Sequence, residues 1–123
     1  MTHDIHVTVK PNYIAQQSRP AEGRYVYAYT ITIANQSDVA AQLIGRHWII
    51  RDQEEKKQEI RGIGVVGEQP YLGPGKSYTY TSGVILETQT GIMQGSYQMK
   101  SDDGKLFDVE IPAFALVPPH AIH

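Results

Sequence analysis

Residues 62–67 read Gly-Ile-Gly-Val-Val-Gly and match the spacing G-x-G-x-x-G of dinucleotide-binding loops. In those loops the glycines follow a parallel strand and open a helix whose N–H groups hold the pyrophosphate. Here residues 68–75 contain two prolines and two glycines, which preclude a regular helix, and Glu68 would place a negative charge beside the phosphates. We therefore predict a structural role for Gly62, Gly64 and Gly67, which let a strand bend or another backbone approach closely.

A second phosphate-binding pattern is suggested by Gly75-Lys76-Ser77, which resembles the end of a Walker A loop. That loop requires a glycine five residues before Gly75, where this chain has Pro70. Residues 77–80 continue as an alternating strand rather than a helix. This segment therefore predicts a turn followed by a strand.

Five histidines raise the question of a metal site. His3 and His6 are an odd number of residues apart, so on one strand they face opposite sides and cannot chelate together. His120 and His123 follow two prolines near the end of the chain and are weak candidates for a divalent ion, since neither has a fixed partner. His47, beside Trp48, is expected to be an ordinary hydrogen-bonded strand residue. We expect no resident metal and no cofactor.

Candidate catalytic groups are equally sparse. The chain has no cysteine and no G-x-S-x-G elbow. Asp102, Asp103, Asp108 and Glu110 could be acid–base carboxylates, but the first two suit a hairpin turn and the last two a solvated strand face. We expect no catalysis, with an undetected hydrolase as the remaining enzymatic alternative.

The whole-chain totals exclude several classes. A chain of 123 residues suits one domain, residues 1–123, and the absence of cysteine suits a reducing compartment. No apolar signal core or membrane-length apolar run is present, so we expect a cytoplasmic protein with no membrane insertion. The net charge of −2, with scattered bases, does not favour nucleic acid as a partner.

The elements that would position these residues read as strands. Isoleucine and valine far outnumber leucine, which favours strands over helices. Residues 25, 27, 29, 31 and 33 are apolar at period two, and this is the clearest strand. The strands expected are residues 5–10, 25–34, 39–52, 58–62 with a continuation at 62–66, 76–82, 93–100 and 106–117.

The connections between these strands carry turn signals. We expect a turn at residues 35–38, a hairpin rather than a helix at the charged residues 52–59, a loop at 64–75, and a tight turn at Asp103-Gly104. Leu86, Gly91, Met93 and Tyr97 stand where immunoglobulin-like domains place a leucine and a tyrosine corner. The fold class predicted is an all-β, immunoglobulin-like or fibronectin type III-like sandwich of seven to eight antiparallel strands.

The segment from Gly62 through Glu68-Gln69-Pro70, with Leu72 and Pro74-Gly75, resembles the ApaG family. The segment His47-Trp48-Ile49-Ile50 also fits that family. A later run is similar to the family's second motif and consists of Tyr80, Ser82, Leu86, Thr88, Gly91, Met93, Gly95 and Tyr97. Gln89 departs from the pattern, because the family has a proline there.

The resemblance, which covers essentially the whole chain, implies a fibronectin type III-like sandwich. Bacterial members, also called CorD, are associated with cobalt resistance and magnesium efflux. The domain also occurs in eukaryotic F-box proteins and in a polymerase delta-interacting protein, where it is a protein-interaction module.

The function expected is that of a non-enzymatic binding module with an unknown protein partner. Its surface would be the loop at residues 64–75 and the neighbouring strand edges. Tyr71 and Leu72 would be apolar anchors, and Glu68 and Gln69 would be polar contacts. The full set of candidates is Gly64, Val65, Val66, Gly67, Glu68, Gln69, Pro70, Tyr71 and Leu72. The alternative is weak binding of a phosphate, nucleotide or divalent metal, and an exposed edge strand would permit a homodimer.

Overall fold

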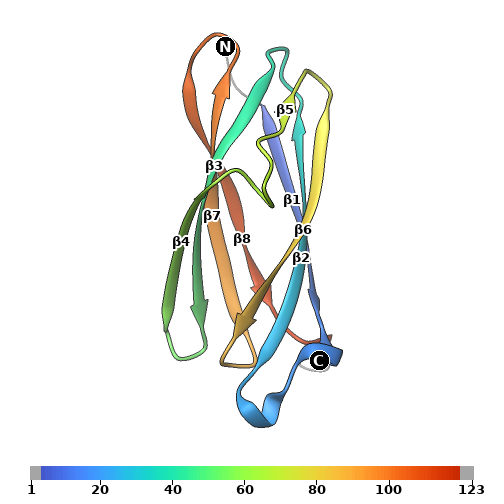
Figure 1. Ribbon diagram of the computed structural model, residues 1–123, viewed down its shortest axis with the longest axis vertical. Coiled ribbons are helices and arrows are strands. Elements are labelled where there is room, and N and C mark those ends of the chain that lie inside the picture. The colour runs from blue at the N-terminus through green and yellow to red at the C-terminus, as the bar shows by residue number, and fades with distance from the viewer. Residues whose placement is uncertain (1–3, 120–123) are drawn as a thin grey trace.

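The structure is a computed structural model that describes residues 4–119, and it consists of two antiparallel β-sheets packed face to face (Figure 1). This arrangement confirms the predicted all-β sandwich. Branched and aromatic residues line the inner faces of both sheets, where a pleated surface lets them pack. Helical structure among the described residues is limited to two short 3₁₀ turns, and none of it is long and apolar enough to cross a membrane.

Eight strands are present in the described part of the chain. They are β1 (Ile5–Tyr13), β2 (Tyr25–Asn35), β3 (Ala41–Asp52), β4 (Lys57–Ile63), β5 (Tyr71–Leu72), β6 (Ser77–Leu86), β7 (Gly91–Ser101) and β8 (Leu106–Leu116). The 3₁₀ turns, at Ala15–Gln17 and Pro20–Glu22, lie between β1 and β2.

The first sheet has the strand order β1-β2-β6, and the second has the order β4-β3-β7-β8. The short strand β5 pairs with β3 beyond the end of β4. β1 lies against β8 and joins the two sheets along one side of the sandwich. On the opposite side, the segment between β4 and β5 crosses the space between the sheets (Figure 1).

The core follows the alternation of β2, as predicted. Tyr27, Tyr29, Ile31 and Ile33 are all buried on one face of this strand. The second sheet covers them with its own buried residues, namely Leu43, Trp48, Ile50, Met93, Tyr97 and Met99.

Three turn predictions are also confirmed. Bends occupy residues 37–39, and β3 and β4 form an antiparallel hairpin in which Arg51 pairs with Lys57. Between β7 and β8, Gly104 takes a left-handed φ of 86° and donates its N–H to the Ser101 carbonyl at 2.9 Å. Glycine adopts that φ without steric cost, which is why Asp103-Gly104 signalled a tight turn.

The strand expected at residues 5–10 runs to Tyr13 as β1, because Pro11 is tolerated on an edge strand. Four further local expectations are wrong. β6 continues to Leu86, because Val84 and Leu86 resume its inward alternation beyond Gly83. The expected loop at 64–75 contains β5, since Leu72 is buried while its backbone pairs with Ala41. β4 ends at Ile63, and Val65 makes only an isolated bridge with Glu68.

The fourth concerns Tyr97, which does not form a tyrosine corner. A tyrosine corner bonds its hydroxyl to nearby backbone. The Tyr97 hydroxyl instead hydrogen-bonds the hydroxyl of Tyr80, which lies in β6 of the facing sheet.

A β-bulge in β3 changes which residues face the core. Leu43 pairs with Met99 and Gly45 with Gln98, so Ile44 is an extra residue in the ladder. An inserted residue reverses the alternation, because side chains change face at every step. Arg46 therefore lies in phase with Trp48 and Ile50, on the inner face of the sheet.

Candidate functional site

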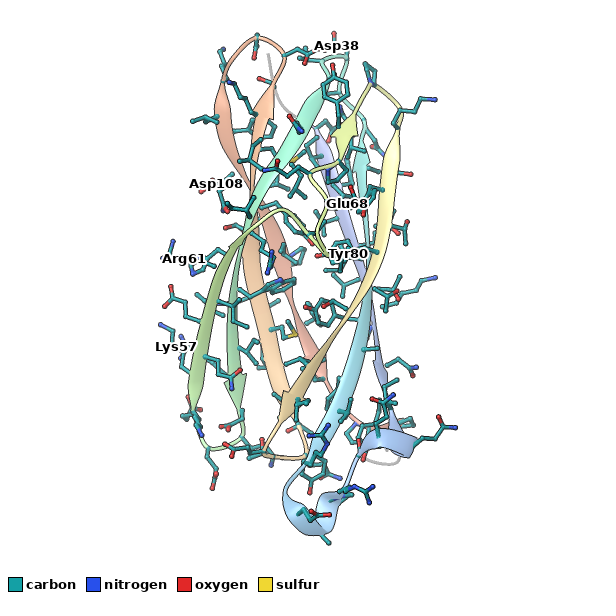
Figure 2. The ribbon with its side chains drawn as sticks, viewed as in Figure 1. Asp38, Lys57, Arg61, Glu68, Tyr80 and Asp108 are labelled. Carbon is teal, nitrogen blue, oxygen red and sulfur yellow. The ribbon has the colours of Figure 1, made fainter. Side chains whose placement is uncertain are left out.

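The segment between β4 and β5, together with β5, is the candidate site, because it contains every predicted partner-binding residue. β4 and β5 follow the same edge of β3, and residues 64–70 leave that edge between them. In Figure 2 this loop, marked by Glu68, descends between the two sheets toward Tyr80. Arg61 and Lys57 project from β4 to the outside of the molecule.

A tight turn at residues 65–68 forms the tip of the loop. The N–H groups of Val65 and Glu68 each donate to the other residue's carbonyl, both at 2.8 Å. Gly64 comes directly before this turn and Gly67 lies within it. Both have left-handed φ values, 66° at Gly64 and 81° at Gly67. A side chain at Gly64 would be blocked, because a Cβ there would lie 2.3 Å from the Glu68 carbonyl oxygen.

This geometry differs from that of a dinucleotide loop. The Gly64 N–H donates to the Ile44 carbonyl at 2.8 Å, and the Val65 and Glu68 N–H groups are used within the turn. Gly62 lies inside β4, opposite Arg46. No helix follows the glycines; the chain enters β5 instead. The glycines therefore shape a turn and a close approach of backbones.

Several anchors hold the loop in place. Val65 and Leu72 are buried, so these two predicted contact residues secure the loop and cannot present side chains to a partner. The Pro70 carbonyl accepts the Leu43 N–H at 2.9 Å. The Gln69 side chain donates to the Ile44 carbonyl at 3.0 Å, while its backbone carbonyl accepts from Gln42.

The buried side chain of Asn35 is a further anchor and holds β5 in place. Its amide donates to the carbonyls of Leu72, at 2.9 Å, and Val39, at 3.0 Å. Its side-chain oxygen accepts the N–H and hydroxyl of Ser37. One buried amide thus fixes β5 to the turn between β2 and β3.

Three apolar side chains at the end of β4, in the loop and in β5 are exposed, and we call them the β4–β5 surface: Ile63, Val66 and Tyr71. Ile60 is also exposed, but it lies three residues before Ile63 on β4 and faces the opposite side of the strand. Tyr71 is 58% exposed and donates its hydroxyl to Asp102 at 2.6 Å, an interaction that raises its pKa. Val66 is 54% exposed and has a φ of 41°, in the left-handed region that a β-branched residue rarely adopts. Glu68 and Gln69 are exposed beside them.

Arg46 lies beneath the loop. Its guanidinium covers Gly62, and its Nη1 donates to the carbonyls of Ile63, at 3.1 Å, and Gly64, at 2.8 Å. A Cβ at residue 62 would lie 2.7 Å from the guanidinium carbon, so glycine makes room for this cation. Gly62 thus accommodates the arginine rather than a phosphate.

The other residues considered for chemistry lie apart from this segment's interior. His47 faces outward and bonds Glu59 through Nε2 at 2.6 Å, which lowers the pKa of Glu59. Asp103 accepts from Ser101 in the β7–β8 turn, and Asp108 and Glu110 are exposed on β8. Residues 4–119 contain no group of three potential metal ligands, and His3, His120 and His123 lie outside the described residues.

Sequence reasoning missed Arg46 and Ile63 as site residues. Arg46 precedes Trp48 and Ile50 at period two, a signal that could have placed it on the inner face. Ile63 lies within the glycine motif, and its residue type and spacing do not mark it as a contact residue. Its exposure reflects its position at the end of an edge strand, which the sequence did not define.

Comparison with known proteins identifies the family of the chain. Residues 15–101 match the ApaG domain family. Protein ApaG of Thiobacillus denitrificans is 54% identical over 121 residues, which cover 98% of this chain and 95% of that protein. Protein ApaG of Pseudomonas aeruginosa is 52% identical over 121 residues, which cover 98% of this chain and 96% of that protein.

Solved structures also resemble this chain. The crystal structure of an ApaA protein from Bordetella pertussis superposes with a TM-score of 0.93 and 48% identity, covering 95% of each chain. A protein from Archaeoglobus fulgidus shares the fold alone, with a TM-score of 0.53 and 10% identity over 94% of this chain and 97% of that one. The domain match and the identities along nearly the full length show that this chain belongs to the ApaG family.

Proposed function

We propose that this chain is a non-enzymatic, protein-binding module whose partner docks on the β4–β5 surface. The observation that carries this proposal is the distribution of exposed apolar side chains. Three of the seven large hydrophobic side chains exposed among the described residues, Ile63, Val66 and Tyr71, come from the end of β4, the loop and β5. Exposed apolar side chains that gather in one segment mark interaction sites, whereas isolated exposed residues are ordinary.

The position of these side chains supports the proposal. Ile63 is 78% exposed at the end of the edge strand β4, and no strand of residues 4–119 pairs with the outer backbone groups of β4. Proteins usually protect such edges with charge, and β4 does carry Lys57, Glu59 and Arg61 before Ile63. A partner with an apolar segment would cover Ile63, Val66 and Tyr71 together.

The rigidity of the loop also supports it. The tip turn, the buried Val65 and Leu72, and the Asn35 bonds fix the backbone before any partner arrives. Binding by a preorganised loop loses less conformational entropy than binding by a flexible one. The left-handed φ of Val66 adds a strained residue at the exposed tip, a feature that clusters at binding sites.

We place this contact in the cytoplasm and in the context of cobalt resistance and magnesium efflux that the family resemblance implies. In this proposal the domain acts through the protein that it binds. It carries no ion and catalyses no reaction itself.

The test is affinity capture with the tagged full chain from the source cell, followed by a dissociation constant for the recovered protein. Tyr71→Phe and Tyr71→Ala separate the loss of the Asp102 bond from the loss of the ring. Val66→Gly deletes an exposed side chain and at the same time relieves its backbone strain. Ile92→Lys is the matched control, since Ile92 is 50% exposed and lies on β7, away from the loop.

We expect Ile63→Lys, Val66→Gly and Tyr71→Ala each to weaken binding by about tenfold or more, as for central contacts of an interface. Tyr71→Phe and Ile92→Lys should retain binding. The proposal would be wrong if all variants recovered the same proteins with equal affinity, or if Tyr71→Ala changed only the melting temperature.

A further inference from the structure

A cavity of about 130 Å³ lies between the two sheets, directly under the tip of the β4–β5 loop. Val65 and Val66 of the loop line it, together with Trp48 of β3. Its polar wall is formed by Arg46 from the second sheet and by Tyr29, Tyr80 and Ser82 from the first. A polar cavity in the interior of a β-sandwich is unusual, because this space is normally filled by apolar side chains.

Arg46 is charged, and the other described residues that line this cavity are neutral. Arg46 is a cation that is half-buried on the inner face of β3. None of the ion pairs within residues 4–119 includes it, and its hydrogen bonds, both through Nη1, go to neutral carbonyls. A partly desolvated cation without an anionic partner is costly, so an anion in the cavity would be favoured.

The remaining polar groups of the wall are hydroxyls that can donate to an anion. Burial raises the pKa of Tyr80 to about 12 and also raises that of Tyr29, so both hydroxyls keep their protons near neutral pH. When the Tyr97 hydroxyl donates to Tyr80, the Tyr80 proton is left to point elsewhere. Among the described residues, none that lines the cavity carries a carboxylate.

We propose that this cavity is a binding site for a single small oxyanion group, a carboxylate or a phosphate, held by the Arg46 guanidinium and the hydroxyls of Tyr29, Tyr80 and Ser82. The guanidinium matches such oxygens in charge and planar geometry. A cavity of this volume accepts an anion of a few heavy atoms and excludes a nucleotide, since pockets for drug-sized ligands measure about 300–1,000 Å³. The site shares Val66 with the exposed β4–β5 surface and does not use the glycine N–H groups.

Trp48 provides a direct reporter, because it lines the cavity and is the single tryptophan of the chain. We suggest titrating the full chain with inorganic phosphate and, in a second series, with acetate, at ionic strength held constant with sodium chloride. Tryptophan fluorescence and the arginine Nε–H signals in NMR spectra would be followed. A dissociation constant of about 1 mM would give near-saturation by about 10 mM.

Three variants define the site. Arg46→Gln removes the cation, and Tyr80→Phe removes one hydroxyl while retaining the ring. Gly62→Ala keeps the charge but displaces the guanidinium, because the new methyl group would lie 2.7 Å from its carbon. Arg61→Gln is the matched control, since Arg61 is on the outer face of β4 and pairs with Glu59.

We expect saturable binding of one anion, with an affinity at least about tenfold lower in Arg46→Gln and Gly62→Ala and unchanged in Arg61→Gln. The stronger of the phosphate and acetate series identifies the natural oxyanion class. If Arg46→Gln unfolds, Tyr80→Phe and Gly62→Ala still decide the question. An absent or non-saturable response in the unsubstituted protein, or equal loss in Arg61→Gln, would overturn the proposal.

Discussion

At the scale of single residues, Gly64 and Gly67 have different reasons to be glycine. Both adopt left-handed φ values, yet only Gly64 is crowded, with the Glu68 carbonyl oxygen 2.3 Å from where a Cβ would be. At Gly67, no atom of the described residues other than its two chain neighbours lies within 4 Å of the corresponding position. Gly67 is therefore required only for its backbone conformation. Gly64 is required both for its backbone conformation and because there is no room for a side chain.

This difference predicts unequal effects of alanine. Gly67→Ala should lower the free energy of unfolding by about 1–2 kcal/mol, the cost of a left-handed alanine. Gly64→Ala should cost about 3 kcal/mol or more, because the turn must also open. Urea unfolding followed by Trp48 fluorescence measures both. Equal losses in the two variants would show that the loop yields to the added methyl group without cost.

At the scale of elements, the placement of β5 depends on a turn that belongs to another part of the chain. Asn35 ends β2, and its buried amide bonds the Leu72 carbonyl of β5 and the Val39 carbonyl before β3. A two-residue strand has too few ladder bonds to hold itself, since isolated pairs of strands are marginal in water. Tyr71 is therefore presented by an element that relies on this amide.

We predict that Asn35→Asp lowers the free energy of unfolding by about 3 kcal/mol or more, because a carboxylate cannot donate to either carbonyl and is buried without a cation. Asn12→Asp on β1 is exposed and should change stability by about 0.5 kcal/mol or less. Denaturation curves give these values, and amide exchange at Leu72 should accelerate in Asn35→Asp alone. Slow exchange there would mean that β5 is held by its pairing with β3.

At the scale of the whole molecule, Tyr80 and Tyr97 join the two sheets through their buried hydroxyls. Burial raises the pKa of Tyr80 from its ordinary value of 10.0 to about 12 and raises that of Tyr97 still further. Both groups are protonated in the folded and unfolded states at neutral pH. Above pH 10 the unfolded chain loses these protons first, so folding stability must fall as pH rises.

The expected result is constant stability from these two residues below about pH 10 and a loss of about 1.4 kcal/mol per pH unit for each tyrosine above it. The loss through Tyr80 ends near pH 12, where the folded protein also ionises. Phenolate absorbance in folded and urea-unfolded protein, with unfolding measured at several alkaline pH values, tests this. Tyr80→Phe should show a shallower decline, and an identical decline would exclude the contribution of Tyr80.

Much of the fold could be predicted from local sequence. The odd-numbered face of β2 is buried as its alternation indicated, and Asp103-Gly104 makes the tight turn expected. The glycine motif was separated from cofactor loops by the prolines that follow it. These features are local, because period two and turn chemistry act over a few residues.

The tertiary structure decided which side chains meet across the sandwich. The bulge at Ile44 turns Arg46 inward, and only the facing sheet brings Tyr29, Tyr80 and Ser82 to it. The packing of the two sheets also decides that Leu72 and Val65 are buried anchors, whereas Ile63 and Tyr71 are exposed. Alternation specifies that a strand has an inner face; the residues that share its interior are set by strand order and bulges, which are long-range properties of the packed chain.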